Sequence, residues 1–136
     1  MNDSDLKVAI LIPTMNRPAF VVRQLEYYAS VNSPHPIYIA DSSREKEKKI
    51  IEGAVDRLRG DIEVNYKYCP GLNDRQAFLE VLMECSEPFC ALIADDDFFI
   101  SESLTKCAAF LVENPDYRTA QGKAIIFDLD DVYGVT

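Results

Sequence analysis

Residues 89–97 read FCALIADDD, an apolar run that ends directly in three aspartates. An uninterrupted apolar run of this length is typical of a strand that is covered on both faces of a parallel sheet, so we expect Phe89–Ala94 to be a central strand. Three consecutive carboxylates repel one another unless a cation or hydrogen-bond donors compensate their charge. The stretch therefore predicts a buried strand that delivers acidic side chains to one edge of a sheet.

Further strands and helices alternate along the rest of the chain. We expect four more strands, over 7–12, 37–40, 62–67 and 119–127, and four helices that begin near Pro18, Ser42, Asn73 and Ser101. Ser42 and Glu45 have the spacing of a capping box, and Ser101 is the expected N-cap of the last helix. Because parallel neighbours need helical crossovers, this order predicts an α/β fold with a mostly parallel sheet between layers of helices.

The composition excludes several classes of protein. The 136 residues are about one domain, and 23 acidic residues against 14 basic ones give a formal charge of −9, which opposes binding to nucleic acid or anionic lipid. No segment approaches the roughly 18 apolar residues of a membrane span, and the start MNDSDLK does not have the layout of a secretion signal. We therefore expect a cytoplasmic, single-domain protein with no nucleic-acid partner and no membrane span.

The cysteines and the single histidine give no sign of a zinc or hydrolase site. Cys69, Cys85, Cys90 and Cys107 form no CxxC pair, and we interpret them as reduced thiols, three of them within core segments. His35 lies between two prolines in a predicted loop, and no second histidine exists. We expect His35 to be structural, which excludes a catalytic triad with a histidine base.

Polar residues follow three of the expected strands. Pro13–Arg17 follows the first strand, Asp41–Ser43 the second and Asp95–Asp97 the fourth. In wound parallel sheets, ligands bind beyond the carboxyl ends of the strands, where the strand order reverses. As alternate residues, Asp95 and Asp97 are suited to binding one Mg²⁺ or Mn²⁺ ion, which keeps open positions for phosphate oxygens. The structural alternative is a solvated acidic turn.

Three segments, taken in order, carry a family resemblance. These are VAILIPTMNRP at 8–18, YIADSS at 38–43 and ALIADDDFF at 91–99, with the glycine, arginine and amphipathic helix of residues 70–85 before the last one. Over residues 7–125 the sequence resembles the N-terminal, nucleotide-sugar-binding half of family 2-type glycosyltransferases with the GT-A fold. This resemblance implies a Rossmann-like, three-layer GT-A sandwich that is incomplete at the C-terminus, and it implies that residues 1–136 are one domain of a longer enzyme.

The resemblance also implies roles for nine residues. Pro13 and Thr14 would line the base pocket, with Arg17 near it. Asp41 would accept hydrogen bonds from the base or ribose, and Asp74 and Arg75 would lie over the base and diphosphate. Asp96 would contact ribose or metal, and Asp95 and Asp97 would bind the metal. The family's D-x-D-D pattern aligns either with Ala94–Asp97, where alanine replaces the first aspartate, or with Asp95 and Asp97 as the DXD pair. The structural alternatives are a solvated helix start for Arg17, a carboxylate near a helix N-cap for Asp41, and an exposed first helical turn for Asp74 and Arg75.

The implied activity is transfer of a sugar from a nucleotide-sugar donor, with UDP as the expected nucleotide and Mn²⁺ or Mg²⁺ as the cofactor. The sugar would pass to a hydroxyl of an unidentified acceptor by direct displacement with inversion. No residue matches the family's general base, so the catalytic residues are unknown. The alternative is a non-catalytic nucleotide-sugar-binding or assembly module, and a homodimer would protect a sheet edge left uncovered.

A second motif lies at the end of the chain. Residues 124–136, AIIFDLDDVYGVT, resemble the first motif of haloacid-dehalogenase-like phosphatases, with Asp128 as nucleophile and Asp130 as general acid. Two carboxylates at this spacing after a strand would meet at one Mg²⁺ ion and one phosphate. That motif normally begins its domain, and Asp131 replaces its glycine, so our main interpretation of this segment is the next strand of the sheet and an acidic loop.

Overall fold

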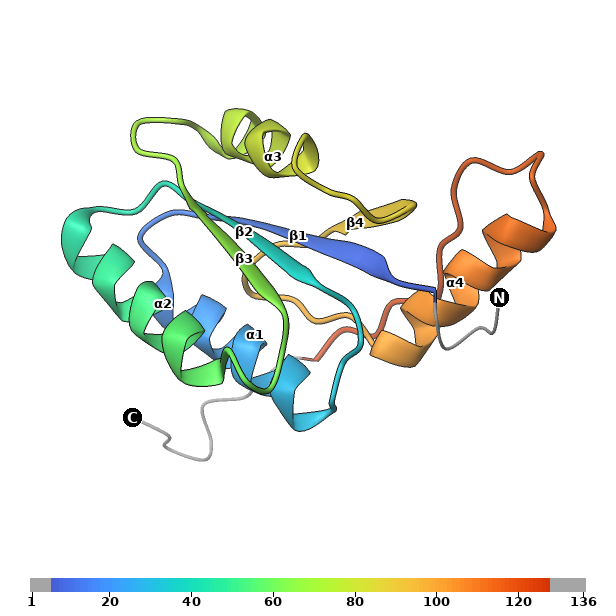
Figure 1. Ribbon diagram of the computed structural model, residues 1–136, viewed down its shortest axis with the longest axis horizontal. Coiled ribbons are helices and arrows are strands. Elements are labelled where there is room, and N and C mark those ends of the chain that lie inside the picture. The colour runs from blue at the N-terminus through green and yellow to red at the C-terminus, as the bar shows by residue number, and fades with distance from the viewer. Residues whose placement is uncertain (1–5, 128–136) are drawn as a thin grey trace.

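The protein alternates strands and helices along the chain, as expected for the α/β class. A computed structural model describes residues 6–127 (Figure 1). Its elements are β1 (Val8–Thr14), α1 (Pro18–Ser30), β2 (Ile37–Asp41), α2 (Glu45–Leu58), β3 (Val64–Tyr68), α3 (Asp74–Leu82), β4 (Phe89–Leu92) and α4 (Ser101–Glu113).

The four strands form one parallel sheet in the order β3-β2-β1-β4. The chain passes from β1 outward to β2 and β3, and then returns to place β4 on the other side of β1. The strand order therefore reverses between β1 and β4, which is the position where ligands bind in sheets of this kind.

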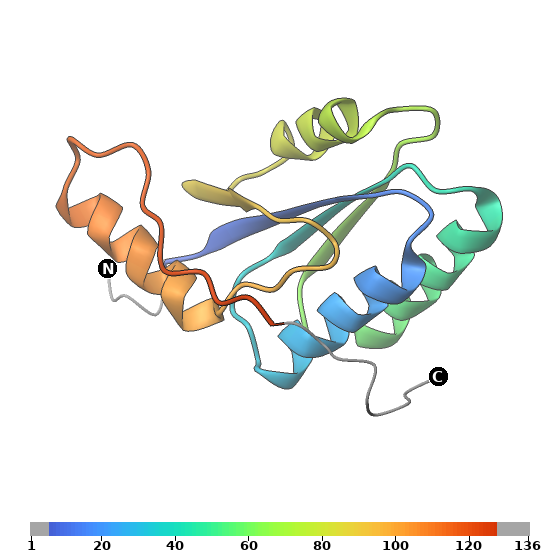
Figure 2. The same ribbon diagram turned by 180° about the vertical axis from the view of Figure 1, so that it is seen from behind.

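Helices cover both faces of the sheet, which gives three layers. Alternate residues of β1 face opposite sides: Val8, Ile10 and Ile12 join the core cluster that contains residues of α1, α2 and α4, whereas Ala9 and Leu11 join a smaller cluster with α3. Figures 1 and 2 show α1 and α2 on one face of the sheet, α3 on the other, and α4 beside the amino-terminal end of β1. The α/β prediction with a parallel sheet between helical layers is confirmed.

Local signals explain where several elements begin and end. Pro18 occupies the first turn of α1, where its missing N–H costs nothing. Asn73 caps α3 because its side-chain oxygen accepts a hydrogen bond from the Gln76 backbone N–H, and the Gln76 side-chain oxygen accepts one from the Asn73 backbone N–H. Helix α4 ends at Glu113, with Asn114 at the C-cap position and Pro115 after it.

The prediction that Phe89–Ala94 is a central strand is wrong. Strand β4 ends at Leu92 and pairs only with β1, so it is an edge strand of the described sheet. Helix α3 packs over β1 and β2 rather than over β4, and Leu92 is 55% exposed. Apolar composition therefore identified a strand but not its position, because the position depends on which strands the helices cover.

Three local predictions also need correction. No strand forms over 119–127, where the chain is irregular and mostly exposed, so the described residues hold four strands rather than five. Ser42 does not cap α2, because its backbone N–H continues the sheet by donating to the Thr14 carbonyl at 2.9 Å, and the helix begins only at Glu45. Ser101 is the first residue of α4, and Ile100 occupies the N-cap position.

His35 is structural, as predicted. Its ring is buried, with Nδ1 accepting a hydrogen bond from the Val8 backbone at 3.1 Å, and Nε2 lies 2.9 Å from the Ser101 carbonyl. Since Nδ1 accepts, the proton is on Nε2 and is donated to Ser101. His35 thereby joins the start of β1 to the start of α4.

The four cysteines form no disulfide bond. Cys69 is buried, Cys85 and Cys107 are half-buried, Cys90 is exposed, and all four are free thiols. Among residues 6–127, no helix is long and apolar enough to cross a membrane.

Candidate functional site

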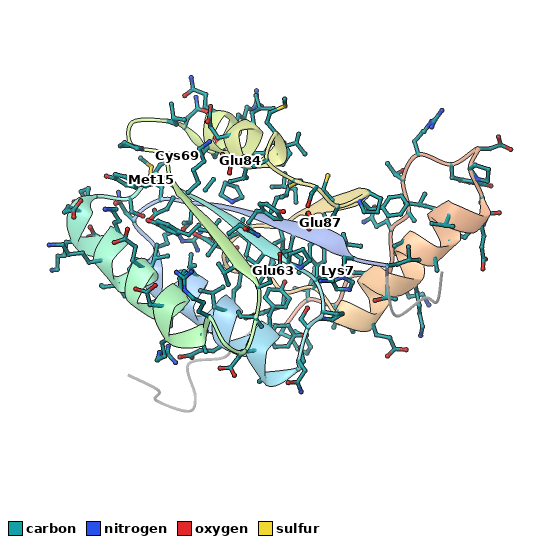
Figure 3. All side chains as sticks on the ribbon, in the orientation of Figure 1. Lys7, Met15, Glu63, Cys69, Glu84 and Glu87 are labelled. Carbon is teal, nitrogen blue, oxygen red and sulfur yellow. The ribbon has the colours of Figure 1, made fainter. Side chains whose placement is uncertain are left out.

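A cleft of about 570 Å³ opens at the carboxyl ends of the strands. Figure 3 shows Met15 and Cys69 near this end of the sheet, and Lys7 and Glu63 at the opposite end. The lining residues come from the last two residues of β1 and from the segments that follow β1, β2, β3 and β4: Pro13, Thr14, Met15, Arg17, Ser42, Gly71, Leu72, Asn73, Asp74, Ala94 and Asp95. Its volume lies within the usual range of small-molecule sites.

The loop after β1 is held against the loop after β2. Asn16 has a positive φ of 56°, a conformation that asparagine tolerates better than most residues. Its backbone N–H donates to the Ser43 hydroxyl at 2.7 Å, and its side-chain oxygen accepts from the Arg44 backbone at 2.8 Å. These bonds fix the backbone that presents Thr14 and Arg17 to the cleft.

Asp95 is the more buried of the two acidic residues that line the cleft, at 4% exposure. Its Oδ2 accepts a hydrogen bond from the Thr14 hydroxyl at 2.8 Å, and its Oδ1 lies 2.8 Å from Nη1 of Arg17. Nη2 of Arg17 also donates to Asp96 at 3.1 Å, and this contact holds the pKa of the Asp96 carboxyl below its usual range. Thr14 and Arg17 thus supply donors to two of the three adjacent carboxylates, Asp95 and Asp96.

Helix α1 holds the turn formed by Asp95, Asp96 and Asp97, the acidic turn, through a residue that the sequence did not single out. Gln24 is buried, and its side-chain nitrogen donates to the backbone carbonyls of Ala94 (2.8 Å) and Asp97 (2.5 Å). The hydroxyl of Tyr28 accepts from the Phe99 backbone at 3.0 Å, and burial raises the pKa of Tyr28 to about 12. The available signal was a glutamine within the apolar stripe of α1, where a polar side chain needs a buried partner.

Asp97 is the outward-facing carboxylate of the turn. Its backbone N–H donates to the Ala94 carbonyl at 3.2 Å, which closes the turn. The residue is exposed, and within residues 6–127 its carboxylate has neither an ion pair nor a hydrogen-bond donor. The turn therefore directs Asp95 inward and leaves Asp97 accessible to a ligand.

Asp41 has a structural role in this fold. It is fully buried, with Oδ1 accepting from the Ser43 backbone at 2.8 Å and Oδ2 from the Tyr66 hydroxyl at 2.7 Å. Burial, followed by the bond to Asp41, raises the pKa of Tyr66. Asp41 does not line the cleft, and each of its carboxylate oxygens already accepts a hydrogen bond within the protein.

The start of α3 forms another wall of the cleft. Gly71, with a positive φ of 76°, turns the chain toward Asn73, and Asp74 begins the helix. Asp74 lines the cleft, whereas Arg75, in the exposed first turn, does not.

The structure thus brings together part of the expected set. Five of the nine residues line the cleft (Pro13, Thr14, Arg17, Asp74 and Asp95), two directly follow Asp95 in the acidic turn (Asp96 and Asp97), and two do not line it (Asp41 and Arg75). Asp128 and Asp130 lie outside the described residues.

The acidic turn suits a divalent cation only in part. Residues 6–127 contain no group of three or more side chains arranged to hold a metal ion by themselves. Mg²⁺ commonly uses one or two carboxylates and takes its other ligands from substrate phosphates and water. Asp96 and Asp97, both exposed, fit that requirement, whereas a metal ion at buried Asp95 would share an oxygen with Thr14 or Arg17, or displace one of them.

Known proteins share this fold. No family model and no curated protein sequence matched the chain. The crystal structure of S. aureus TarS 1–349 superimposes with a TM-score of 0.64 at 17% identity, over 81% of this chain and 33% of that solved chain. The mannosyltransferase PcManGT from Pyrobaculum calidifontis, solved with GDP-Man and Mn²⁺, gives a TM-score of 0.66 at 13% identity, over 84% of this chain and 35% of the other.

This chain therefore spans about a third of the length of either structure. The TM-scores of 0.64 and 0.66 show a shared fold, and at identities of 17% and 13% the likeness is one of fold alone. The chain has the GT-A-type α/β fold of the glycosyltransferases that its sequence resembles.

Proposed function

We propose that this chain is the nucleotide-sugar-binding domain of a glycosyltransferase, and that residues 1–136 are part of a longer enzyme. The observation that carries the proposal is the cleft at the carboxyl ends of the strands, where Thr14 and Arg17 meet the acidic turn beside the point at which the strand order reverses. The fold is shared with a mannosyltransferase solved with GDP-Man and Mn²⁺, which supports a nucleotide-sugar ligand here.

The charge of the cleft supports the use of a divalent cation. Its lining carries two aspartates, Asp74 and Asp95, and one arginine, Arg17, and two more aspartates follow Asp95. A diphosphate entering this surface meets repulsion unless a cation is present. We propose that Asp97, with Asp96 or Asp95, holds Mn²⁺ or Mg²⁺ against the diphosphate. Bound there, the ion stabilises the negative charge that develops on the departing diphosphate.

The chain's own residues would bind and orient the donor. We propose that Pro13 and Thr14 border the base, and that Asp74 and Arg75 at the start of α3 lie over the base and diphosphate. We also propose that Asp41, the last residue of β2, accepts hydrogen bonds from the base or ribose. In the reaction, an acceptor hydroxyl oxygen attacks the anomeric carbon, the bond from that carbon to the diphosphate oxygen breaks, and the hydroxyl proton passes to a base. We assign no residue of this chain as that base.

The nucleotide is proposed to be UDP, on the resemblance of the sequence, and GDP is the comparison because one fold neighbour was solved with GDP-Man. The acceptor is a hydroxyl-bearing molecule whose class is not assigned. A cytoplasmic location and a homodimer stay predictions from the sequence.

Calorimetric titration with UDP and with GDP, each with and without Mn²⁺, tests the proposal. We expect one nucleotide to bind only with Mn²⁺, and Asp97→Asn to weaken that binding by about tenfold or more, because a ligand carboxylate is lost. The matched control is Asp61→Asn, which neutralises an exposed carboxylate preceding β3, at the other end of the sheet, and should leave binding unchanged.

Sugar release from the corresponding nucleotide sugar, followed by NMR, separates the two functional alternatives. Mn²⁺-dependent binding with sugar release or transfer supports an enzyme. Binding without either supports a nucleotide-sugar-binding module. If neither nucleotide binds in the presence of Mn²⁺, the proposal is refuted.

A further inference from the structure

Arg17 already provides a positive charge at the place where the acidic turn needs one. Its two terminal nitrogens contact Asp95 at 2.8 Å and Asp96 at 3.1 Å, and its guanidinium lies 4.2 Å from the centre of the Phe20 ring. With Thr14 on the other oxygen of Asp95, both oxygens of that carboxylate are occupied. A metal ion at Oδ1 of Asp95 would share that oxygen with the positively charged guanidinium of Arg17, and repulsion between the two cations favours displacement of Arg17.

The same side chain is placed to move. Arg17 stands at the N-cap position of α1, so its backbone is fixed, and its side chain is 42% exposed although its main partner, Asp95, is buried. Arg17 also lines the cleft. A guanidinium that leaves Asp95 therefore stays next to any ligand bound in the cleft, and guanidinium groups bind phosphate oxygens in bidentate geometry.

We propose that Arg17 is the internal counter-cation of the acidic turn, and that it exchanges Asp95 for a diphosphate oxygen when a divalent cation binds to the aspartates. This inference rests on the proposed function and adds to it which positively charged group pairs with the aspartates before and after a metal ion binds. Without a metal ion, Arg17 neutralises Asp95 and Asp96. With a metal ion and a nucleoside diphosphate, the carboxylates bind the metal and Arg17 binds the diphosphate.

Two thermodynamic consequences follow. Arg17 and the metal ion compete for Asp95, so the protein should bind Mn²⁺ weakly in the absence of nucleotide. The exchange also links the two ligands: a diphosphate that draws Arg17 away favours the metal ion, and by reciprocity the metal ion favours the diphosphate to the same extent.

Mn²⁺ titration followed by electron paramagnetic resonance, without nucleotide, tests the competition directly. We expect Arg17→Gln to bind Mn²⁺ about tenfold or more tighter than the unmodified chain, because a charged hydrogen bond no longer has to be broken. The control is Arg23→Gln. Arg23 also contacts Phe20 and contributes to lowering the pKa of Asp96, yet it has no ion pair in the described structure.

The control separates direct competition from the general field of a nearby positive charge. A field effect is screened by salt, so Arg23→Gln should change Mn²⁺ affinity by less than about threefold at 0.15 M salt. Equal gains in the two variants, or no gain in Arg17→Gln, would overturn the inference.

A second variant keeps the test decisive if Arg17→Gln does not fold, which circular dichroism would reveal. Arg17→Lys retains the charge but cannot form the paired contacts with Asp95 and Asp96. We expect it to bind Mn²⁺ about threefold or more tighter, and an unchanged affinity counts against the inference.

The nucleotide measurements distinguish this inference from the proposed function. We expect the ratio of Mn²⁺ affinities with and without UDP or GDP to be larger for the unmodified chain than for Arg17→Gln. If Mn²⁺ and a nucleotide bind together but the ratio is the same in both proteins, only the role of Arg17 is refuted. If no variant binds Mn²⁺ with either nucleotide, both proposals are refuted.

Discussion

Lowering the pH from 7.5 to 5.5 should destabilise this protein through its single histidine. Nδ1 of His35 accepts the Val8 N–H, so a proton added there would face another donor and remove the bond between β1 and the His35 loop. The pKa of His35 is lowered, mainly by burial and further by the charge of Lys7, while the bond to the Ser101 carbonyl raises it in part. Protonation is therefore opposed in the folded state.

The sign and size of the effect follow from linkage. The unfolded chain takes up a proton near pH 6.5, whereas folded His35 takes it up at a lower pH. Stability is full above about pH 6.5 and falls below it, with a slope of at most about 1.4 kcal/mol per pH unit that ends at the folded pKa. Between pH 7.5 and 5.5 the loss in unfolding free energy is therefore at most about 1.4 kcal/mol.

Urea denaturation at pH 7.5, 6.5 and 5.5 measures the slope, and the only histidine in the chain gives an unambiguous NMR titration. His35→Asn, whose side-chain oxygen can still accept from Val8, should lose the slope. The carboxyl groups with lowered pKa, Asp96 and Glu102, contribute mainly below about pH 5. A histidine pKa of about 6.5 or higher, or an equal slope in His35→Asn, would refute this reasoning.

Three other sets of variants test the site and its supports, each by urea denaturation. Thr14→Val leaves buried Asp95 without one donor and should lower the unfolding free energy by about 2 kcal/mol, whereas Thr14→Ser, which keeps the hydroxyl, should retain most of it. Asn73→Ala removes the capping box and should cost about 1 kcal/mol, and a loss below a few tenths would contradict the role of the cap. Gly71→Ala should lower the unfolding free energy by about 1 kcal/mol because φ at this position is positive. Gly53→Ala, inside α2 with open space around it, should raise the unfolding free energy by about 0.5 kcal/mol. Changes of the same sign in the two variants would refute the conformational argument.

Much of the fold could be predicted because its signals are local. The Pro18 start of α1, the Asn73 cap of α3 and the end of α4 before Pro115 depend on backbone hydrogen bonding within one turn. The Ser42 cap failed because Ser42 donates to Thr14 of a neighbouring strand, a partner 28 residues away in the chain that no local pattern shows.

For the site, the sequence predicted which loops converge but not which side chains pair with one another. Parallel strands end at one edge, so the convergence of Thr14, Arg17 and Asp95 followed from the order of elements. The enclosure of Asp41 by Tyr66 and the anchoring of the acidic turn by Gln24 did not, because they depend on how side chains of separate elements meet.

The sequence by itself determined the alternation of strands and helices and the edge at which polar residues gather, since hydrophobic period, caps and prolines act over a few residues. Tertiary structure alone decided that β4 lies at the edge of the sheet described over residues 6–127, that Asp95 faces inward to Thr14 and Arg17, and that Asp97 faces outward. The physical reason is that burial and hydrogen-bond partners are properties of packed elements. Three identical aspartates become different groups only when the surrounding helices and loops supply donors to some and leave another exposed.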